Sequence, residues 1–237
     1  MPNSLRDSNR SILILAILIL LTVSGDVTAD LSIEFDDLEG WEKIKFIGNF
    51  DDSEYSIVQD SLGSYLEVSS ENAISGIAYS EEIEVAGAPI LRFRWRADSL
   101  PIEATPTDAG LDDFVLRLYV LFFESDLSRW DRIRYSFVRS LYGSYPPKRI
   151  LGYVWSTETI PSPYQSKVND RAVYIELDSG TVPDAEWREH VVNVVEDYLR
   201  IYAEEPPEIV RVAVITDSDS TEGHTRGRID YIRFTDR

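Results

Sequence analysis

The segment LRFRWRA at residues 91–97 alternates apolar and cationic side chains over its whole length. Such a period of two is typical of a β-strand that covers a core with one face only. Leu91, Phe93, Trp95 and Ala97 therefore form the predicted core face, and the side chains on the opposite face are Arg92, Arg94 and Arg96. This segment indicates a sheet that packs against a second layer.

A second predicted strand, 114–123, carries apolar side chains on most of both faces. One side holds Phe114, Leu116, Leu118, Val120 and Phe122, and the other holds Val115, Arg117, Tyr119, Leu121 and Phe123. We expect this strand to be covered on both faces. Further strands are predicted at 65–68, 74–79, 150–155, 173–177, 189–194, 209–216 and 229–234.

Two helices interrupt the β pattern. The first spans about 128–141, with apolar residues at helical spacing and Gly143 at its C-terminal stop, and the second spans about 195–203 before Pro206 and Pro207. Turns between short strands and the absence of regular strand–helix alternation favour a sandwich over a parallel α/β fold. The expected fold is mainly β, a jelly-roll-like antiparallel β-sandwich with two short helices.

The N-terminus has the zones of a secretion signal. Arg6 and Arg10 precede an apolar run at 12–21, and Val27-Thr28-Ala29 offers a cleavage site before Asp30. We predict a signal peptide at 1–29, one β-sandwich domain at 30–237, and a periplasmic or secreted product with no stable membrane span after cleavage. An uncleaved anchor is the alternative, although the apolar run is shorter than the roughly 20 residues of a bilayer span.

Composition narrows the classes of function. The net charge of −19 argues against nucleic acid as a partner, and the chain has no cysteine for a disulfide, a thiolate metal site or a thiol nucleophile. The two histidines, His190 and His224, lack metal-ligand spacing, and we expect His190 to pack beside Trp187. Neither a Gly-x-Ser-x-Gly motif nor a phosphate-binding glycine loop is present.

Several blocks resemble an uncharacterised family of secreted bacterial proteins, domain of unknown function 3047. They are LRFRWRAD at 91–98, DDFVLRLYVLF at 112–122, LGYVWS at 151–156, EEPPEIVRVAVITDSDST at 204–221 and IDYIRF at 229–234. The resemblance implies a shared fold and export but no activity. FDDLEGW at 35–41 and the closing IDYIRF are also similar to the terminal strands of galactose-binding-type jelly rolls.

Strand alternation predicts a face away from the core that gathers arginines and aromatic rings. Its members are Arg94, Arg117, Tyr119, Tyr153, Trp155 and Tyr174. Guanidinium groups bind carboxylates and other oxygens, and flat rings can hold the C–H faces of sugars. The alternative is structural: the arginines pair with acidic residues, and the rings pack under the helix at 128–141.

Carboxylates mark the predicted rim of that face. Asp112 and Asp113 open one strand, and Asp217 and Asp219 follow another. Paired carboxylates can serve in glycoside hydrolysis, can bind Ca²⁺, or can simply cap turns. A structural Ca²⁺ between Glu34, Asp36 or Asp37 and Asp230 is a further hypothesis, because jelly rolls often tie their terminal strands together.

The sequence therefore predicts an exported binding domain for a carbohydrate or another small polar ligand, without catalysis. Its ligand-binding residues are predicted to be Arg94, Arg117, Tyr119, Tyr153, Trp155, Asp113, Asp217 and Asp219. The sequence identifies no certain cofactor, and Ca²⁺ is the candidate metal. The alternatives are an envelope polysaccharide hydrolase that uses paired carboxylates and an envelope scaffold that binds another protein.

Overall fold

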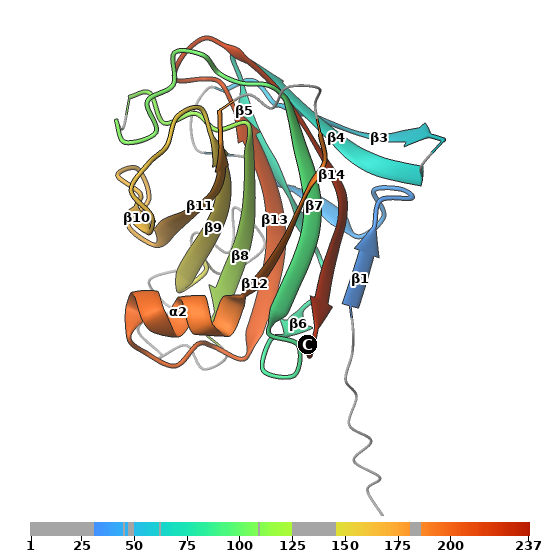
Figure 1. Ribbon diagram of the computed structural model, residues 1–237, viewed down its shortest axis with the longest axis vertical. Coiled ribbons are helices and arrows are strands. Elements are labelled where there is room, and N and C mark those ends of the chain that lie inside the picture. The colour runs from blue at the N-terminus through green and yellow to red at the C-terminus, as the bar shows by residue number, and fades with distance from the viewer. Residues whose placement is uncertain are drawn as a thin grey trace, which may run out of the picture.

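Two β-sheets face each other in the computed structural model (Figure 1). The structure describes residues 31–44, 46, 50–61, 63–108, 110–124, 146–180 and 186–237. The predicted secretion signal and the predicted helix at 128–141 lie outside these residues. The described elements form the expected mainly β, jelly-roll-like sandwich.

Sheet A is six-stranded and antiparallel throughout, in the order β12-β7-β14-β4-β3, with β1 paired to β14. Its strands are β1 (Leu31–Glu34), β3 (Glu54–Asp60), β4 (Gly63–Glu71), β7 (Ile90–Ser99), β12 (Arg188–Asn193) and β14 (His224–Thr235). The quoted segment 91–97 lies within β7, and its predicted alternation is confirmed by a burial pattern that changes at every residue from Leu91 to Ala97.

Sheet B is eight-stranded, in the order β10-β11-β9-β8-β13-β5-β2, with β6 paired to β13. Its strands are β2 (Trp41–Ile44), β5 (Ile74–Tyr79), β6 (Ile83–Glu84), β8 (Leu116–Phe123), β9 (Arg149–Ser156), β10 (Tyr164–Gln165), β11 (Ala172–Ser179) and β13 (Ile209–Asp217). The β9 and β11 pair is parallel, because the connection between them returns the chain to the same end of the sheet. Strand alternation alone does not predict that detail.

The core lies between the sheets. Trp95 of β7 packs against Trp155 of β9, with ring centroids 5.9 Å apart, and Phe93 lies near Tyr153. All four side chains are buried. Burial of such large rings is the main stabilising contribution available to a chain without disulfides.

Helix α2 (Val194–Tyr202) lies at one end of the sandwich, where β12 leads directly into it (Figure 1). The Asn193 side chain accepts hydrogen bonds from the backbone N–H groups of Val195 and Glu196, which fixes the helix start. Tyr198 packs on Phe122 and buries the inner side of the helix. The predicted helix at 195–203 is thus confirmed within one residue.

Among the residues that the structure describes, no helix has both the length and the apolar character that a membrane crossing requires.

The approach of the two sheets is limited at Gly227 of β14. A Cβ atom there would lie 2.7 Å from Cγ of Leu116, on β8 of the opposite sheet. We expect Gly227→Ala to lower the free energy of unfolding by about 1–3 kcal/mol, because Leu116 is fully buried and must shift. Urea unfolding measures the loss. Gly87→Ala is the matched control, since no atom lies within 4 Å of its Cβ position, and equal losses in both variants would contradict this account.

Candidate functional site

Three of the predicted residues meet on the outer face of sheet B. Arg117 donates from one guanidinium nitrogen to the hydroxyl groups of Tyr119 and Tyr174, both at 3.3 Å, and the two hydroxyls lie 3.1 Å apart. The cluster is nevertheless buried, and Arg117 is only 4% exposed. Gly152 permits this packing, because a Cβ there would lie 2.8 Å from the Tyr174 ring.

Tyr153 and Trp155 correct the predicted face, because they point into the core from the other side of sheet B. Tyr153 is paired with Leu118 and Trp155 with Leu116, so all four share the inward face, whereas Arg117 faces outward. The Tyr153 hydroxyl donates to Asp197 at 3.0 Å, and the Trp155 indole donates to the Gly180 carbonyl at 2.9 Å. Both side chains are therefore structural.

Two further placements differ from the sequence prediction. Arg94 lies on sheet A, so it cannot share a face with Arg117 of sheet B. Phe114 and Val115 precede β8 and exchange sides: Val115 joins the core between the sheets, and Phe114 packs with Tyr119 and Tyr174. The single predicted face is thus divided between two outer surfaces and the core.

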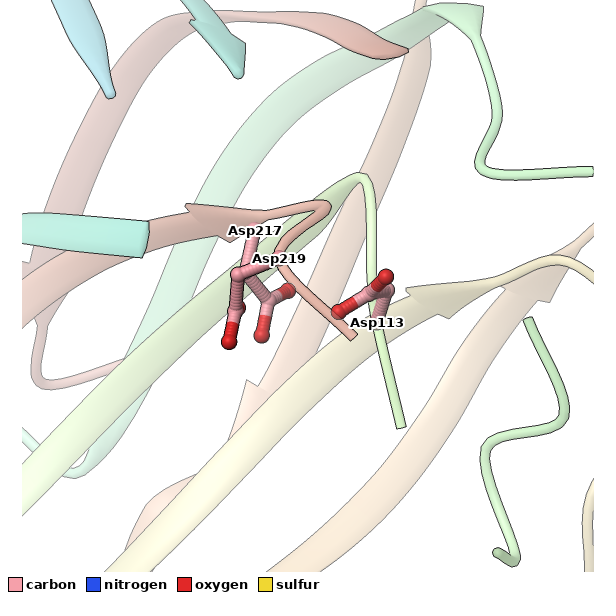
Figure 2. Close-up of side chains that lie close together, drawn as sticks. All are labelled: Asp113, Asp217 and Asp219. Atoms are coloured by element: carbon pink, nitrogen blue, oxygen red, sulfur yellow. The ribbon is translucent and has the colours of Figure 1, made fainter. Parts of the chain in front are cut away.

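The predicted carboxylates do gather at one rim. Figure 2 shows Asp113, Asp217 and Asp219 close together, and each offers an oxygen within 4.8 Å of the others. Asp113 precedes β8, Asp217 ends β13, and Asp219 lies in the loop that follows. Asp113 and Asp217 are buried, whereas Asp219 is partly exposed.

Hydrogen bonds already occupy the two buried carboxylates. Asp113 accepts from the Thr221 backbone N–H at 2.8 Å, from the Thr221 hydroxyl at 2.6 Å and from the Ser220 N–H at 3.2 Å. Asp217 forms an ion pair with Arg117 and accepts from the Phe114 N–H at 2.8 Å. These contacts hold the loop after β13 against the start of β8, so they join distant segments and do not cap a local turn.

Two carboxyls near this rim have pKa values above the ordinary range for aspartate. Burial raises the pKa of Asp219, and the neighbouring Asp113 carboxylate raises it further. Burial also raises the pKa of Asp112, although the positive charge of Arg117 partly offsets this increase. A Ca²⁺ ion usually takes about 6–8 oxygen ligands, so at this rim it would compete with the existing partners of Asp113 and Asp217.

The outer face of sheet A carries a set of residues that we call the cation–π ladder. Its members are Tyr65, Arg94, Arg96, Trp187, Arg228, Tyr231 and Arg233. The guanidinium carbons of Arg94 and Arg96 each lie 5.4 Å from the Trp187 ring centroid. The Trp187 ring meets the Tyr65 ring edge-on at 5.6 Å, and Arg228 lies 5.0 Å above Tyr65.

Acidic side chains are interleaved with the ladder. Arg94 pairs with Asp230 at 2.5 Å, Arg96 with Asp98 at 2.7 Å, and Arg228 with Glu67 at 2.9 Å. Arg233 pairs with Glu34 at 2.8 Å, so a salt bridge joins the terminal strands β1 and β14. Two of the oxygen donors expected for a terminal Ca²⁺, Glu34 and Asp230, are therefore paired with arginines. Sequence reasoning found Arg94 but missed Trp187, which precedes its strand and belongs to no alternating run.

Asp178 forms a second polar cluster that the sequence did not indicate. It accepts hydrogen bonds from the Trp95 indole at 2.7 Å and from Arg188 at 2.7 Å, and it lies 2.6 Å from Nε2 of His190. Burial by itself would raise the pKa of Asp178, but the hydrogen bonds from His190 and Trp95 outweigh it and lower that pKa. The cluster joins β7, β11 and β12 at the edge between the sheets. His190 packs as expected, but its ring contacts are with Phe93 and Trp95, whereas Trp187, the expected neighbour, contacts Tyr65, Arg94 and Arg96.

Comparison with known proteins gives a family match over residues 39–233, to a family described as a protein of unknown function (DUF3047). No curated protein matches the chain.

Solved structures give only distant likenesses. The carbohydrate-binding module CtCBM11 has a TM-score of 0.38 and 10% identity, covering 86% of this chain and 93% of its own. Peanut lectin has a TM-score of 0.40 and 11% identity, covering 87% and 97%. The enzymatically active domain of bacteriophage CBA120 tailspike protein 4 has a TM-score of 0.36 and 9% identity, covering 84% of this chain and 20% of the tailspike chain. This chain therefore spans about a fifth of the tailspike structure. Each TM-score lies below 0.5, so these likenesses have no weight for function.

The Arg117 and Asp217 pair should dominate the stability of the rim. We expect Asp217→Ala to lower the free energy of unfolding by about 3–5 kcal/mol, because it leaves a buried guanidinium without its charge partner. Glu34→Ala removes half of an exposed ion pair and should cost less than about 1 kcal/mol. Urea unfolding of both variants makes the comparison, and similar losses would show that burial does not strengthen the Arg117 contact.

The Asp219 carboxylate should destabilise the fold at neutral pH, because its pKa is raised and the ionised form is partly buried beside Asp113. We expect Asp219→Asn to raise the midpoint of thermal unfolding in chelator by roughly 1–3 °C. A repeat with CaCl₂ tests the predicted cation. Bound Ca²⁺ would raise the midpoint of the parent protein and leave that of Asp219→Asn unchanged, whereas no increase in either would leave the carboxylates as loop contacts only.

Proposed function

The chain belongs to the DUF3047 family, whose described function is unknown, and we propose from its own surface that it is an exported, non-catalytic binding domain for a carbohydrate or another small polar ligand. The cation–π ladder of sheet A is the binding surface. It replaces the face that the sequence predicted around Arg117, Tyr153 and Trp155.

The observation that supports this proposal is the chemical composition of the ladder. The Trp187 ring is partly exposed and offers flat apolar surface to the C–H face of a sugar, and the guanidinium groups of the ladder offer hydrogen-bond donors to hydroxyl oxygens. The Tyr65 and Tyr231 rings are buried and support the arginines that lie over them. The paired carboxylates, Asp98, Asp230 and Glu67, offer acceptors to hydroxyl hydrogens. Donors, acceptors and one accessible ring thus lie together on one sheet face, as a polyhydroxylated ligand requires.

The exposure of its side chain separates Arg94 of the ladder from the buried Arg117. The Arg94 side chain is 37% exposed, whereas that of Arg117 is 5% exposed. Arg94 contacts two ladder rings, those of Trp187 and Tyr231, and is already oriented by Asp230. A ligand would therefore meet a guanidinium that needs little ordering on binding.

The hydrolase alternative receives less support. A glycosidase needs two carboxyl groups that flank an open cleft, about 5–10 Å apart. Asp113 is fully buried, and both of its oxygens accept hydrogen bonds from the loop at 220–221. Asp217 is bound to Arg117 and to a backbone N–H. Only Asp219 of the three is partly exposed.

A glycan array with the protein from residue 30 onward, which contains both sheets, tests the proposal. Screening with and without Ca²⁺ also tests whether glycan binding depends on that cation. We expect Trp187→Ala and Arg94→Ala each to weaken glycan binding about tenfold or more, equivalent to about 1.4 kcal/mol, because each removes a stacking or hydrogen-bonding surface. Calorimetry with the best glycan gives the affinities.

Val168→Ala is the matched control, because Val168 is exposed and belongs to the turn between β10 and β11 of sheet B. The affinity of Val168→Ala for the best glycan should equal that of the parent protein. Unchanged binding in both ladder variants would reject this surface, and a protein that binds no glycan at all would favour the scaffold alternative.

A further inference from the structure

A pocket of about 330 Å³ opens at the end of sheet A, between β3, β4 and the start of β14. Its lining includes Asp51, Asp52, Glu54, Glu71, Ser69 and Arg226. This volume lies at the lower end of the range of about 300–1,000 Å³ for small-molecule sites. It is far larger than a single metal ion needs and suits one small organic group.

The wall of the pocket is held by a dense set of hydrogen bonds. Asp51 forms a parallel bridge with Ala73, and its carbonyl accepts from the Ile74 N–H at 3.0 Å. The Ser70 hydroxyl donates to the Ala73 carbonyl at 2.6 Å. The Asn72 N–H donates to the Gly223 carbonyl at 3.1 Å, which ties the loop before β14 to the same wall. These contacts fix the backbone of the wall, from which the exposed carboxylates of the pocket project.

The pocket is continuous with the cation–π ladder. In the pairing of β14 with β4, Arg226 lies opposite Ser69, and Arg228 lies opposite Glu67. Residues two apart on a strand share a face and are separated by about 7 Å. The pocket pair, Arg226 and Ser69, is therefore the next row of side chains after the ladder pair, Arg228 and Glu67. One ligand of a few sugar units can reach both.

The pocket has an excess of negative charge. Four carboxylates line it with one guanidinium, that of Arg226. Lys43 pairs with Asp52 at 2.7 Å, which leaves, among the described residues and with His224 counted as neutral, an excess of two negative charges from Asp51, Glu54 and Glu71 against Arg226. The arginines of the ladder, in contrast, are matched by carboxylates. The ladder therefore suits a neutral part of a ligand, and the pocket suits a positively charged group.

We infer that the pocket takes a protonated amine, so that the carbohydrate bound by this domain is an amino sugar with a free ammonium group. An ammonium group has three N–H donors and no acceptor, and carboxylates and serine hydroxyls are the acceptors that match it. N-acetylation removes that charge. This inference rests on the proposed function, because the ladder must hold the adjoining sugar rings.

The test compares two ligands of equal length, an oligomer of glucosamine and the corresponding oligomer of N-acetylglucosamine. Calorimetry is done at a pH at which the amine is protonated, in low salt and with chelator. We expect the parent protein to bind the amine form at least tenfold more tightly. The Glu54→Gln, Glu71→Gln double variant should lose this preference and keep its affinity for the N-acetylated form.

The matched control is the Glu82→Gln, Glu158→Gln double variant, which removes two exposed charges outside the pocket lining and should retain the preference. Trp187→Ala should weaken the binding of both oligomers by the same factor. If the parent binds both forms equally, or if the pocket variant retains the preference, the amine assignment is wrong while the binding function stands. If neither these oligomers nor any glycan on the array binds, both the assignment and the proposed function are wrong.

Discussion

The alternation of side chains across β7, with its large rings packed between the sheets, is the constraint on which the rest of this structure depends. Because Phe93 and Trp95 lie in the core against Tyr153 and Trp155, the arginines between them must face away from it. A shift of one residue in register would bury Arg94 and Arg96 without partners, at a large cost in free energy. The packing of the core therefore determines the composition of the outer face.

The side chains of sheet B alternate in the same way, but the arginine on its outer face is buried. Arg117 is directed away from the core by its neighbours on β8, and it is nevertheless buried. A buried guanidinium needs a charge partner and further hydrogen bonds, and Asp217, Tyr119 and Tyr174 supply them. The carboxylate that sequence reasoning assigned to ligand binding is thus required to neutralise Arg117.

Side-chain direction was predicted correctly for strand 91–97 and for 116–122 of the strand predicted at 114–123, which is covered on both faces as expected, but it was predicted wrongly for Tyr153 and Trp155. The segment 91–97 has a clear period, so its inward and outward residues were identified correctly. The segment 150–155 is buried on both sides, so its sequence leaves open whether Tyr153 faces inward or outward. The alternation of residues within a strand also does not indicate which sheet the strand joins. For this reason Arg94 and Arg117 were predicted to share a face, although they belong to different sheets. The pocket combines Asp51, Glu71 and Arg226, and only the pairing of β4 with β14 brings these distant positions together.

The charge of the whole chain bears on which ligand this surface can attract. A net charge of −19 produces a long-range field that repels anions and draws in cations. An isolated arginine cluster would suit an anionic sugar, but the ladder arginines are paired with carboxylates and add little net charge to the face. They act as oriented hydrogen-bond donors beside aromatic rings. Among the residues that the structure describes, the acidic pocket is the part of this surface where the carboxylates outnumber the positive charges. The side chains of the surface and the negative field of the whole chain therefore favour the same ligand. Its sugar rings are neutral, and the group that enters the pocket is positively charged.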